Sequence, residues 1–395
     1  MLPESSAFGI AIFGGILLLS VIISRIAEKI KLPSVILFIL LGIAMGPYGI
    51  KINGRPLITP ENIPISIQSI VGVSLAFLLF QAGFLIRWES FKGILLRTTK
   101  LVTIGLGITV SLLGITIYFL TSMDPIYAIL LAAILGSTDP FAVFSFSSKL
   151  KPHVARTLEA ETICDDSVVI LIVSAILSSL MLAKSPLPEM SLSILAGILV
   201  GILSAFLCAL LVQKFKIERK SPIFLIGFTI FVYAITELIG GNGILSCFIF
   251  GLILGNVKLP YTRNIKIIQK QITTIIMVII FTLTGILINL EQLTHSDLMN
   301  GLIITFALLF LIRPFAVYSS LIKERLTLNE KTRIGLIGPR GIVSAALALE
   351  VGSLGLSYGS EIVNLTFVVI VASILIDSLI FLAIGRKSRR KYRKS

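Results

Sequence analysis

Residues 125–148 read PIYAILLAAILGSTDPFAVFSFSS, an apolar run of transmembrane length that the polar stretch GSTDP interrupts at 136–140. A helix that crosses the hydrocarbon core of a bilayer needs about 20 predominantly apolar residues. Proline lacks a backbone N–H and frees carbonyl groups in the preceding turn. Inside a membrane those carbonyls must find partners, so a broken helix has to be buried in protein or line a cavity. The stretch therefore predicts a discontinuous transmembrane helix in a polytopic membrane protein.

The rest of the chain has the same apolar character. Of its 395 residues, 56% are apolar and only 14% are charged, and its mean hydropathy is +1.02. A soluble globular chain carries about 25% charged residues. These values exclude a disordered chain, a coiled coil and a soluble enzyme. No polar stretch reaches the size of a soluble domain.

The apolar runs predict an all-α membrane protein of about thirteen transmembrane helices. The predicted spans are 7–25, 32–49, 65–87, 100–121, 125–148, 158–182, 189–213, 221–239, 243–257, 271–290, 298–319, 331–350 and 362–385. Spans 1–6 and 8–13 can then form two inverted six-helix repeats joined by span 7, which is a common plan in transporters. Span 12 is interrupted by GPRG at 338–341. Spans 5 and 12 occupy the fifth position of each half, so we expect two interrupted helices that meet at the transport site.

The basic residues orient these spans. With the N-terminus outside, the cytoplasmic ends hold 29 of the 34 lysines and arginines and the outer loops hold three. This asymmetry is the positive-inside signal of a multi-pass protein in the cell membrane. The net charge of +14 therefore needs no nucleic-acid partner, although the basic tail at 386–395 can also touch anionic membrane lipid. No metal-ligand spacing of Cys and His occurs, so no cofactor is expected.

Ionisable residues within spans are rare and indicate function by default. Span 6 places Glu161 and Asp165 on one helical face, with Asp166 about 100° further round. Adjacent carboxylates at low dielectric repel each other and can exchange protons near neutral pH as a coupled pair. Carboxylate and hydroxyl oxygens are also the ligands that hard cations prefer. The cluster therefore predicts a site for protons, a small cation, or both.

The two interruptions add polar groups to this cluster. Span 5 contributes Thr138 and Asp139 beside the carbonyls that Pro140 frees, and a cation is one partner for such carbonyls. Arg340 in span 12 stays charged at ordinary pH and so needs a carboxylate. Glu161 and Asp165 are both candidates for that carboxylate. The remaining intramembrane charges, Arg313, Glu237 and Asp377, are expected to serve packing or pairing.

Taken together, these motifs resemble the sodium/hydrogen exchanger family of the cation:proton antiporter-1 type, most closely its prokaryotic antiporters. The order and spacing of the motifs carry the resemblance over nearly the whole chain: Thr138-Asp139-Pro140, Glu161 followed five residues later by Asp166, GPRG at 338–341, LGIAMGP at 41–47, LFQAG at 79–83, and the glycine motifs at 241–243 and 251–256. The resemblance implies a secondary active antiporter, not an enzyme. It would exchange Na⁺ or Li⁺ for protons by alternating access and serve pH homeostasis.

The resemblance also implies an architecture and roles for individual residues. A homodimer would form through a dimer-type part, about 1–90 and 189–290, beside an ion-binding core, about 100–182 and 298–385. The broken spans 5 and 12 would cross within this core. The ion and protons would compete for Asp166. Further ion ligands would be Asp139, Thr138, Asp165 and Thr162, and the metal site proper would be Asp166, Asp139 and Thr138 holding Na⁺. Glu161 and Arg340 would form a core ion pair.

One departure from the family pattern keeps alternatives open. The family usually has Asn at the position of Asp165. An Asp-Asp pair looks instead like a second antiporter family, whose members are often electrogenic but usually carry Lys opposite the pair. Electroneutral exchange is therefore open, and K⁺/H⁺ antiport is the first alternative. Weaker alternatives are a cation channel, for which no selectivity filter appears, a proton-coupled solute carrier, and an intramembrane aspartyl protease, whose sequence contexts are absent.

Overall fold

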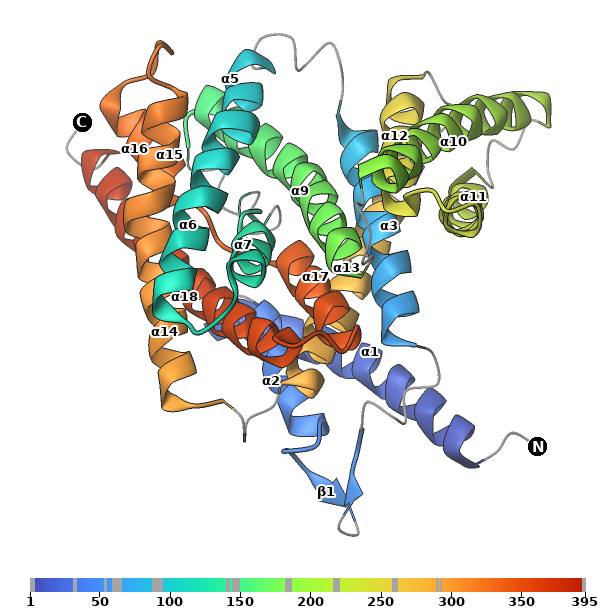
Figure 1. Cartoon of the computed structure of the whole chain (residues 1–395), viewed down its shortest axis with the longest axis horizontal. Coiled ribbons are helices and arrows are strands. Elements are labelled where there is room, and N and C mark those ends of the chain that lie inside the picture. The colour runs from blue at the N-terminus through green and yellow to red at the C-terminus, as the bar shows by residue number, and fades with distance from the viewer. Residues whose placement is uncertain are drawn as a thin grey trace.

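The computed structural model describes residues 4–30, 34–52, 55–58, 66–86, 95–139, 143, 150–181, 187–215, 221–257, 262–288, 291 and 293–392. Over these ranges the regular secondary structure is helical, apart from a short antiparallel ribbon of β1 (Lys51–Ile52) and β2 (Arg55–Pro56) (Figure 1). The predicted all-α fold class is confirmed.

The helices follow the predicted spans in order. In the first half they are α1 (Glu4–Ile30), α2 (Ser34–Met45), α3 (Ile67–Leu85), α5 (Leu95–Lys100), α6 (Leu106–Leu120), α7 (Pro125–Ile134) and α9 (Pro152–Met181). Then come α10 (Leu187–Lys214), α11 (Ser221–Leu238), α12 (Gly243–Asn256), α13 (Thr262–Leu287), α14 (His295–Phe306), α15 (Arg313–Ser320), α16 (Leu328–Leu336), α17 (Ile342–Ser353) and α18 (Gly359–Tyr392). The second part of predicted span 5 lies mostly outside the described residues.

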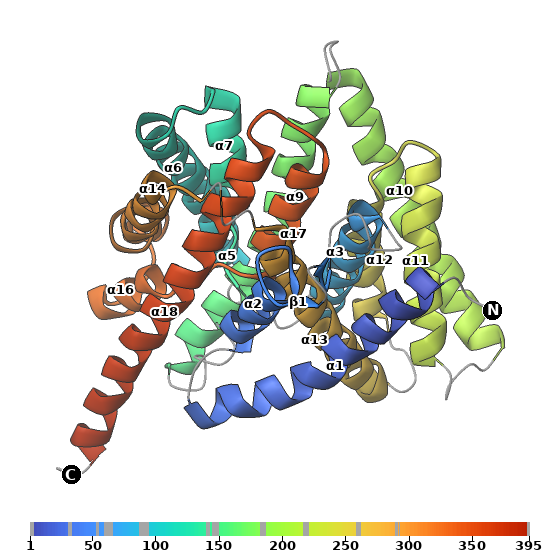
Figure 2. The ribbon, with the colours of Figure 1, turned by 90° about the horizontal axis from the view of Figure 1, so that it is seen from below.

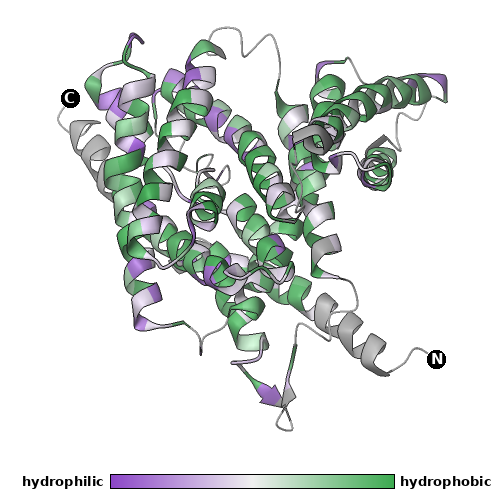
Figure 3. Ribbon diagram, in the orientation of Figure 1, coloured by the Kyte–Doolittle hydropathy of each residue, from purple (hydrophilic) through white to green (hydrophobic). Residues whose placement is uncertain are grey.

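Several of these helices are long and apolar enough to cross a membrane. In the part of the chain that the structure describes, five continuous stretches qualify by length and composition: Leu96–Leu120, Ser191–Lys214, Ile267–Leu287, His295–Ser320 and Gly359–Ile380. Seven shorter apolar helices accompany them. The colouring in Figure 3 shows mainly hydrophobic residues along most helices. α9 has 30 residues, but four of them are the acids Glu159, Glu161, Asp165 and Asp166.

Two pairs of irregular helices occupy equivalent places in the two halves. The helix of predicted span 4 contains a π-helical segment, η2 (Leu101–Gly105), between α5 and α6. The helix of span 11 contains η3 (Ala307–Ile312) between α14 and α15. The next span in each half is the interrupted one. Because π-helical segments are rare and concentrate at functional sites, their matched positions accord with the inverted-repeat plan.

The helices gather into two groups that meet along α9, α13 and α17. On one side α12 packs against α3 and α10, with α11 beside them; on the other α6 packs against α7, and α14 against α18 (Figures 1 and 2). α2 packs against α13, and α17 contacts both α3 and α13. The interrupted segments 135–139 and 337–341 therefore lie beside the region where the groups meet.

Ionic contacts join the two halves at the ends that the charge pattern assigns to the cytoplasm. Glu324 accepts hydrogen bonds from Lys100 at 2.6 Å and Arg97 at 3.0 Å. Glu330 caps α16 through Thr327 and is bonded by Lys151 at 2.8 Å, with His153 Nε2 at 3.1 Å. The Lys151 hydrogen bond, with that of the Thr327 backbone, lowers the pKa of Glu330 to about 2. Both glutamates therefore stay ionised at neutral pH.

The close packing of α3 on α12 yields a testable prediction. A Cβ on Gly251 of α12 would overlap the backbone carbonyl of Phe80 in α3. We expect Gly251→Ala to destabilise the protein by about 1–3 kcal/mol, because backbone cannot move aside as a flexible side chain can. The measurement is the thermal unfolding midpoint of the detergent-solubilised protein.

Gly107→Ala is the matched control for Gly251→Ala. Gly107 also lies in a helix, but an added Cβ there would meet no atom within 4 Å. Alanine is the better helix former by about 1 kcal/mol, so this variant should keep or raise the midpoint. Equal midpoints for the two variants would contradict the close approach of α3 and α12.

Candidate cation site

The first interruption follows directly from the residues after α7. α7 begins at Pro125, where the fixed φ of proline suits the first helical turn, and ends at Ile134. Gly136 to Asp139 then leave the helical conformation. The break predicted at GSTDP is therefore present, although Pro140 itself lies outside the described residues.

The second interruption is the GPRG segment between α16 and α17. Ile337 has extended backbone angles, residues 338–341 are not helical, and α17 begins at Ile342. Gly341 is required where the segments touch, because a Cβ there would overlap the side chain of Asp139. The predicted break in span 12 is confirmed, and its partner across the contact is the break after α7.

Hydrogen bonds tie the two interrupted segments together. The Asp139 backbone N–H donates to the Pro339 carbonyl at 2.7 Å. Nη1 of Arg340 donates to the carbonyls of Gly136 and Ser137, at 3.0 and 2.5 Å. Arg340 thereby satisfies carbonyls that the end of α7 leaves exposed, and its positive charge suits the negative end of the helix dipole.

Side chains of α9 complete the cluster. The Thr138 and Thr162 hydroxyls are 2.8 Å apart and hydrogen-bonded. The Ser137 hydroxyl donates to the carboxylate of Asp166, which also lies near the negative charge of Asp139. All five side chains are at most 5% exposed. Residues of two elements, α9 and the interrupted segment after α7, therefore form a buried site around Asp166.

The arrangement leaves acceptor oxygens without donors. In the described part of the chain, Oδ1 of Asp165 and Oδ1 of Asp166 are buried and have no hydrogen-bond partner. A buried carboxylate oxygen is costly unless a proton or a cation satisfies it. Thr162 lies one helical turn before Asp166 on α9, and its hydroxyl is bonded to that of Thr138, so the region offers the kind of oxygen ligands that a hard cation takes.

The prediction that Glu161 forms its ion pair with Arg340 is wrong. Among the described residues, Glu161 pairs with Arg313 of α15, at 3.3 Å between Oε1 and Nη2. Arg340 instead donates hydrogen bonds to the carbonyls after α7. Both arginines still act on the acids through their charge, and Asp377 of α18, 2% exposed, interacts with both. Four elements thus share a buried network of charges.

A cavity lies next to the acidic turn of α9. It measures about 230 Å³ and lies between α3, α9 and α12, with a lining that includes Leu79, Cys164, Ser167 and Phe248. Two of its α9 residues, Cys164 and Ser167, flank Asp165 and Asp166 in the sequence. The cavity therefore lies beside the acidic turn of α9, at the junction of the two helix groups, although neither acid is among its lining residues.

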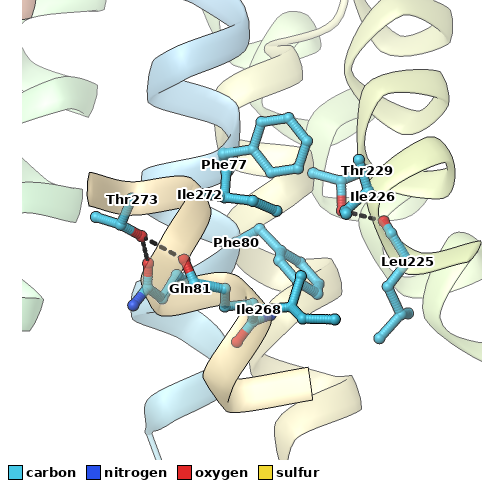
Figure 4. Close-up of a pocket in the computed structure, with 10 residues that line it drawn as sticks. Phe77, Phe80, Gln81, Leu225, Ile226, Thr229, Ile268, Ile272 and Thr273 are labelled. Carbon is cyan, nitrogen blue, oxygen red and sulfur yellow. Dashed lines mark hydrogen bonds between the residues drawn. The ribbon is translucent and has the colours of Figure 1, made fainter. Parts of the chain in front are cut away.

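A second pocket, between α3, α11 and α13, contains none of the acidic residues. Figure 4 shows its lining, where the Thr273 hydroxyl faces both the Gln81 side chain and the Gln269 carbonyl. Its volume is about 10 Å³, roughly the space of one water molecule. We assign no ion to it.

The structure brings together the residues that the sequence singled out, and it adds others. Thr138 and Thr162 are hydrogen-bonded, Asp139 and Asp166 act on each other through their charges, and Asp165 interacts with Glu161 and both arginines. Their roles in ion binding stay predictions. Sequence reasoning missed the contact of Ser137 with Asp166 and that of Ser344 with the end of α7. Ser137 stands inside the GSTDP motif and could have been found there; nothing in the sequence marks Ser344.

Known proteins resemble this chain over nearly its full length. The family profile described as "Sodium/hydrogen exchanger, transmembrane" matches residues 15–387. The Na(+)/H(+) antiporter 1 of Methanocaldococcus jannaschii is 31% identical over 363 residues, which cover 87% of this chain and 83% of that protein. The K(+)/H(+) antiporter NhaP of Alkalimonas amylolytica is 27% identical, and the match spans 94% of this chain but 65% of that protein's length.

A solved structure agrees in fold. The sodium proton antiporter MjNhaP1 from Methanocaldococcus jannaschii, determined at pH 8, superposes with a TM-score of 0.81 at 25% sequence identity. The match covers 97% of this chain and 99% of that one. The similarity therefore includes both helix groups and the interrupted helices between them.

Proposed function

Because this chain belongs to the sodium/hydrogen exchanger family, we propose that it is a secondary active antiporter that exchanges Na⁺ or Li⁺ for protons across the cell membrane. The cation and the proton occupy Asp166 in turn, so each excludes the other. Asp139, Thr138, Thr162 and Asp165 supply the further oxygen ligands.

One observation carries the proposal: among the described residues, buried Asp165 and Asp166 each have a carboxylate oxygen without a hydrogen-bond donor, one helical turn after Thr162, whose hydroxyl is bonded to that of Thr138. A site that can satisfy such oxygens either with a proton or with a cation couples the two by competition. Alkali on the cytoplasmic side removes the proton, and the metal ion then takes its place.

Alternating access follows from a division of the chain that is part of the proposal. The core, about 100–182 and 298–385, carries the ion and moves against a dimer-type part, about 1–90 and 189–290. The cavity beside Cys164 and Ser167 lies where these two parts would meet and supports a path there. In the same proposal the protein is a homodimer with its N-terminus outside and its C-terminal tail in the cytoplasm. Two of the site's acids are neighbours, so one-for-one electroneutral exchange is not assumed.

K⁺/H⁺ exchange is the second candidate. The Alkalimonas relative carries that name, and Asp165 places a second carboxylate next to Asp166 in this chain. A larger cation needs more oxygens at longer distances, which an extra carboxylate could provide. The same site residues serve either ion, so the choice between them is one of coordination geometry.

The test is a flux assay on purified protein in proteoliposomes that contain a pH-sensitive dye. With the membrane potential clamped by valinomycin and potassium, pulses of sodium and then lithium are added at several pH values. Sodium- or lithium-dependent alkalinisation or acidification establishes exchange, and repeating the pulse without the clamp reports whether the cycle moves net charge. A response to neither ion, followed by a potassium response in the absence of valinomycin, would replace the first candidate with the second. A response to none of the three would overturn antiport.

A further inference from the structure

We infer that Ser137 is an additional ligand of the transported cation and that Ser344 positions its hydroxyl for that task. This inference rests on the proposed function. Ser137 follows the end of α7 and is 1% exposed, and Ser344 lies in α17 and is 0% exposed. Their hydroxyl oxygens are 3.3 Å apart.

The hydrogen bonds of the two serines define what each can do. The Ser344 hydroxyl is 2.7 Å from the Ile134 carbonyl and donates its only proton there. The lone pairs of its oxygen are thus available to Ser137. The Ser137 proton therefore has two acceptors within reach, the carboxylate of Asp166 and the oxygen of Ser344.

A cation at Asp166 changes which acceptor is favourable. While the Ser137 proton points at the carboxylate, it stands on the side from which a cation approaches, and like charges repel. Turning that proton to Ser344 presents the lone pairs of Ser137 to the cation and leaves no buried polar hydrogen without an acceptor. Without Ser344, the same turn would strand a buried donor, which is costly. Ser344 thus allows the Ser137 oxygen to bind the cation, although Ser344 does not contact the cation itself.

Neighbouring charges do not replace this arrangement. Asp139, Asp165 and Arg340 all act on Asp166 through their charge, but Arg340 has only donors and cannot accept the Ser137 proton. The carbonyl of Ser137 itself is already bonded by Arg340. The side chain of Ser137 is therefore the group of this residue that can turn between two partners.

The test is a double-mutant cycle of Ser137→Ala, Ser344→Ala and both together, with sodium and lithium as the probes. Each single variant is expected to raise the KM for the cation about three- to tenfold with little change in kcat, because one ligand is lost. The double variant should be no worse than either single variant, since both remove the same ligand. Ser344→Thr keeps a hydroxyl and should restore the wild-type KM.

Two controls keep structural damage apart from ligand loss. Ser353→Ala removes another serine of α17, whose hydroxyl donates to the Glu350 carbonyl of its own helix, and should leave KM unchanged. Ser137→Ala leaves the bond between Ser344 and Ile134 in place, so a general weakening of the joint would affect Ser344→Ala alone. KM values equal to the wild type, or single effects that multiply in the double variant, would overturn the inference.

A binding measurement separates this inference from the proposed function. A bound ion stabilises the folded protein in proportion to the logarithm of its concentration above Kd, so thermal shifts are recorded in detergent against NaCl or LiCl, with choline chloride at matched ionic strength. If the wild type shows a saturable shift and the variants need about three- to tenfold more salt, the ligand role stands even where flux is absent. A shift that is identical in all variants would contradict it whatever the flux assay shows.

Discussion

Asp166→Asn is expected to abolish cation-driven proton flux and reduce it to the level of protein-free liposomes. Asparagine is close to aspartate in size and can still accept a hydrogen bond from Ser137, so the local packing should survive. It cannot take up or release a proton, and it brings no negative charge to offset a cation. The variant therefore loses both of the states between which an antiporter must alternate. The measurement is the dye-based flux assay in proteoliposomes with sodium, lithium and potassium.

Glu159→Gln is the matched control for this substitution. Glu159 lies in α9, two residues before Glu161, and its side chain is half-buried. Among the described residues, the structure records no contact between Glu159 and the interrupted segments. Its loss should leave flux within about twofold of the wild type, as is usual for surface substitutions away from special features. Cation-dependent flux in Asp166→Asn at the wild-type rate would remove Asp166 from the centre of the mechanism.

Arg340→Gln is expected to destabilise the folded protein by about 3–5 kcal/mol and to stop transport. That is the usual cost of removing one partner from a buried charge network. Arg340 is 0% exposed, and its guanidinium holds two carbonyls after α7 while offsetting the charge of Asp165, Glu161 and Asp377. Glutamine is shorter and neutral, so the carbonyls lose their donor and the acids lose a counter-charge. The apparent unfolding midpoint in detergent should fall clearly.

Arg97→Gln provides the comparison on the protein surface. Arg97 also forms an ion pair, with Glu324 at 3.0 Å, but its side chain is 23% exposed and Lys100 binds the same carboxylate. Exposed pairs contribute at most about 1 kcal/mol. Arg340→Lys is a further test, because lysine keeps the charge but lacks the planar fork of donors, and it should recover part of the stability. An unfolding midpoint of Arg340→Gln that matched that of Arg97→Gln would show that Arg340 does not hold the two interrupted segments together.

The sequence predicted much of this structure because a bilayer leaves few choices. Long apolar runs must be helices, since every backbone group has to be satisfied within its own segment. The helices consequently follow the expected spans, and the GPRG break falls between α16 and α17 as expected. Acids at membrane depth cannot face lipid, and this placed Asp166, Asp165 and Asp139 in one site before any contact was known.

The pairing of charges could not be read from the sequence in the same way. Arg340 and Arg313 both lie within predicted spans, and the sequence does not show which acid each of them meets. The resemblance implied that Glu161 pairs with Arg340. The structure pairs Glu161 with Arg313 because α15 brings that side chain to within 3.3 Å. Arg340 donates its hydrogen bonds to backbone carbonyls, which are available as acceptors because α7 ends at Ile134.

What the sequence determined by itself was the class of protein, the course of its helices, the two interruptions and the acids that serve them. These features follow from the composition and from the order of residues along the chain, because in a bilayer every backbone polar group has to be satisfied within its own segment. Only the tertiary structure decided which arginine meets which acid and that Ser344 stands 3.3 Å from Ser137. Those contacts join residues 152 and 207 positions apart, where the crossing of helices, not spacing along the chain, sets the distance between side chains.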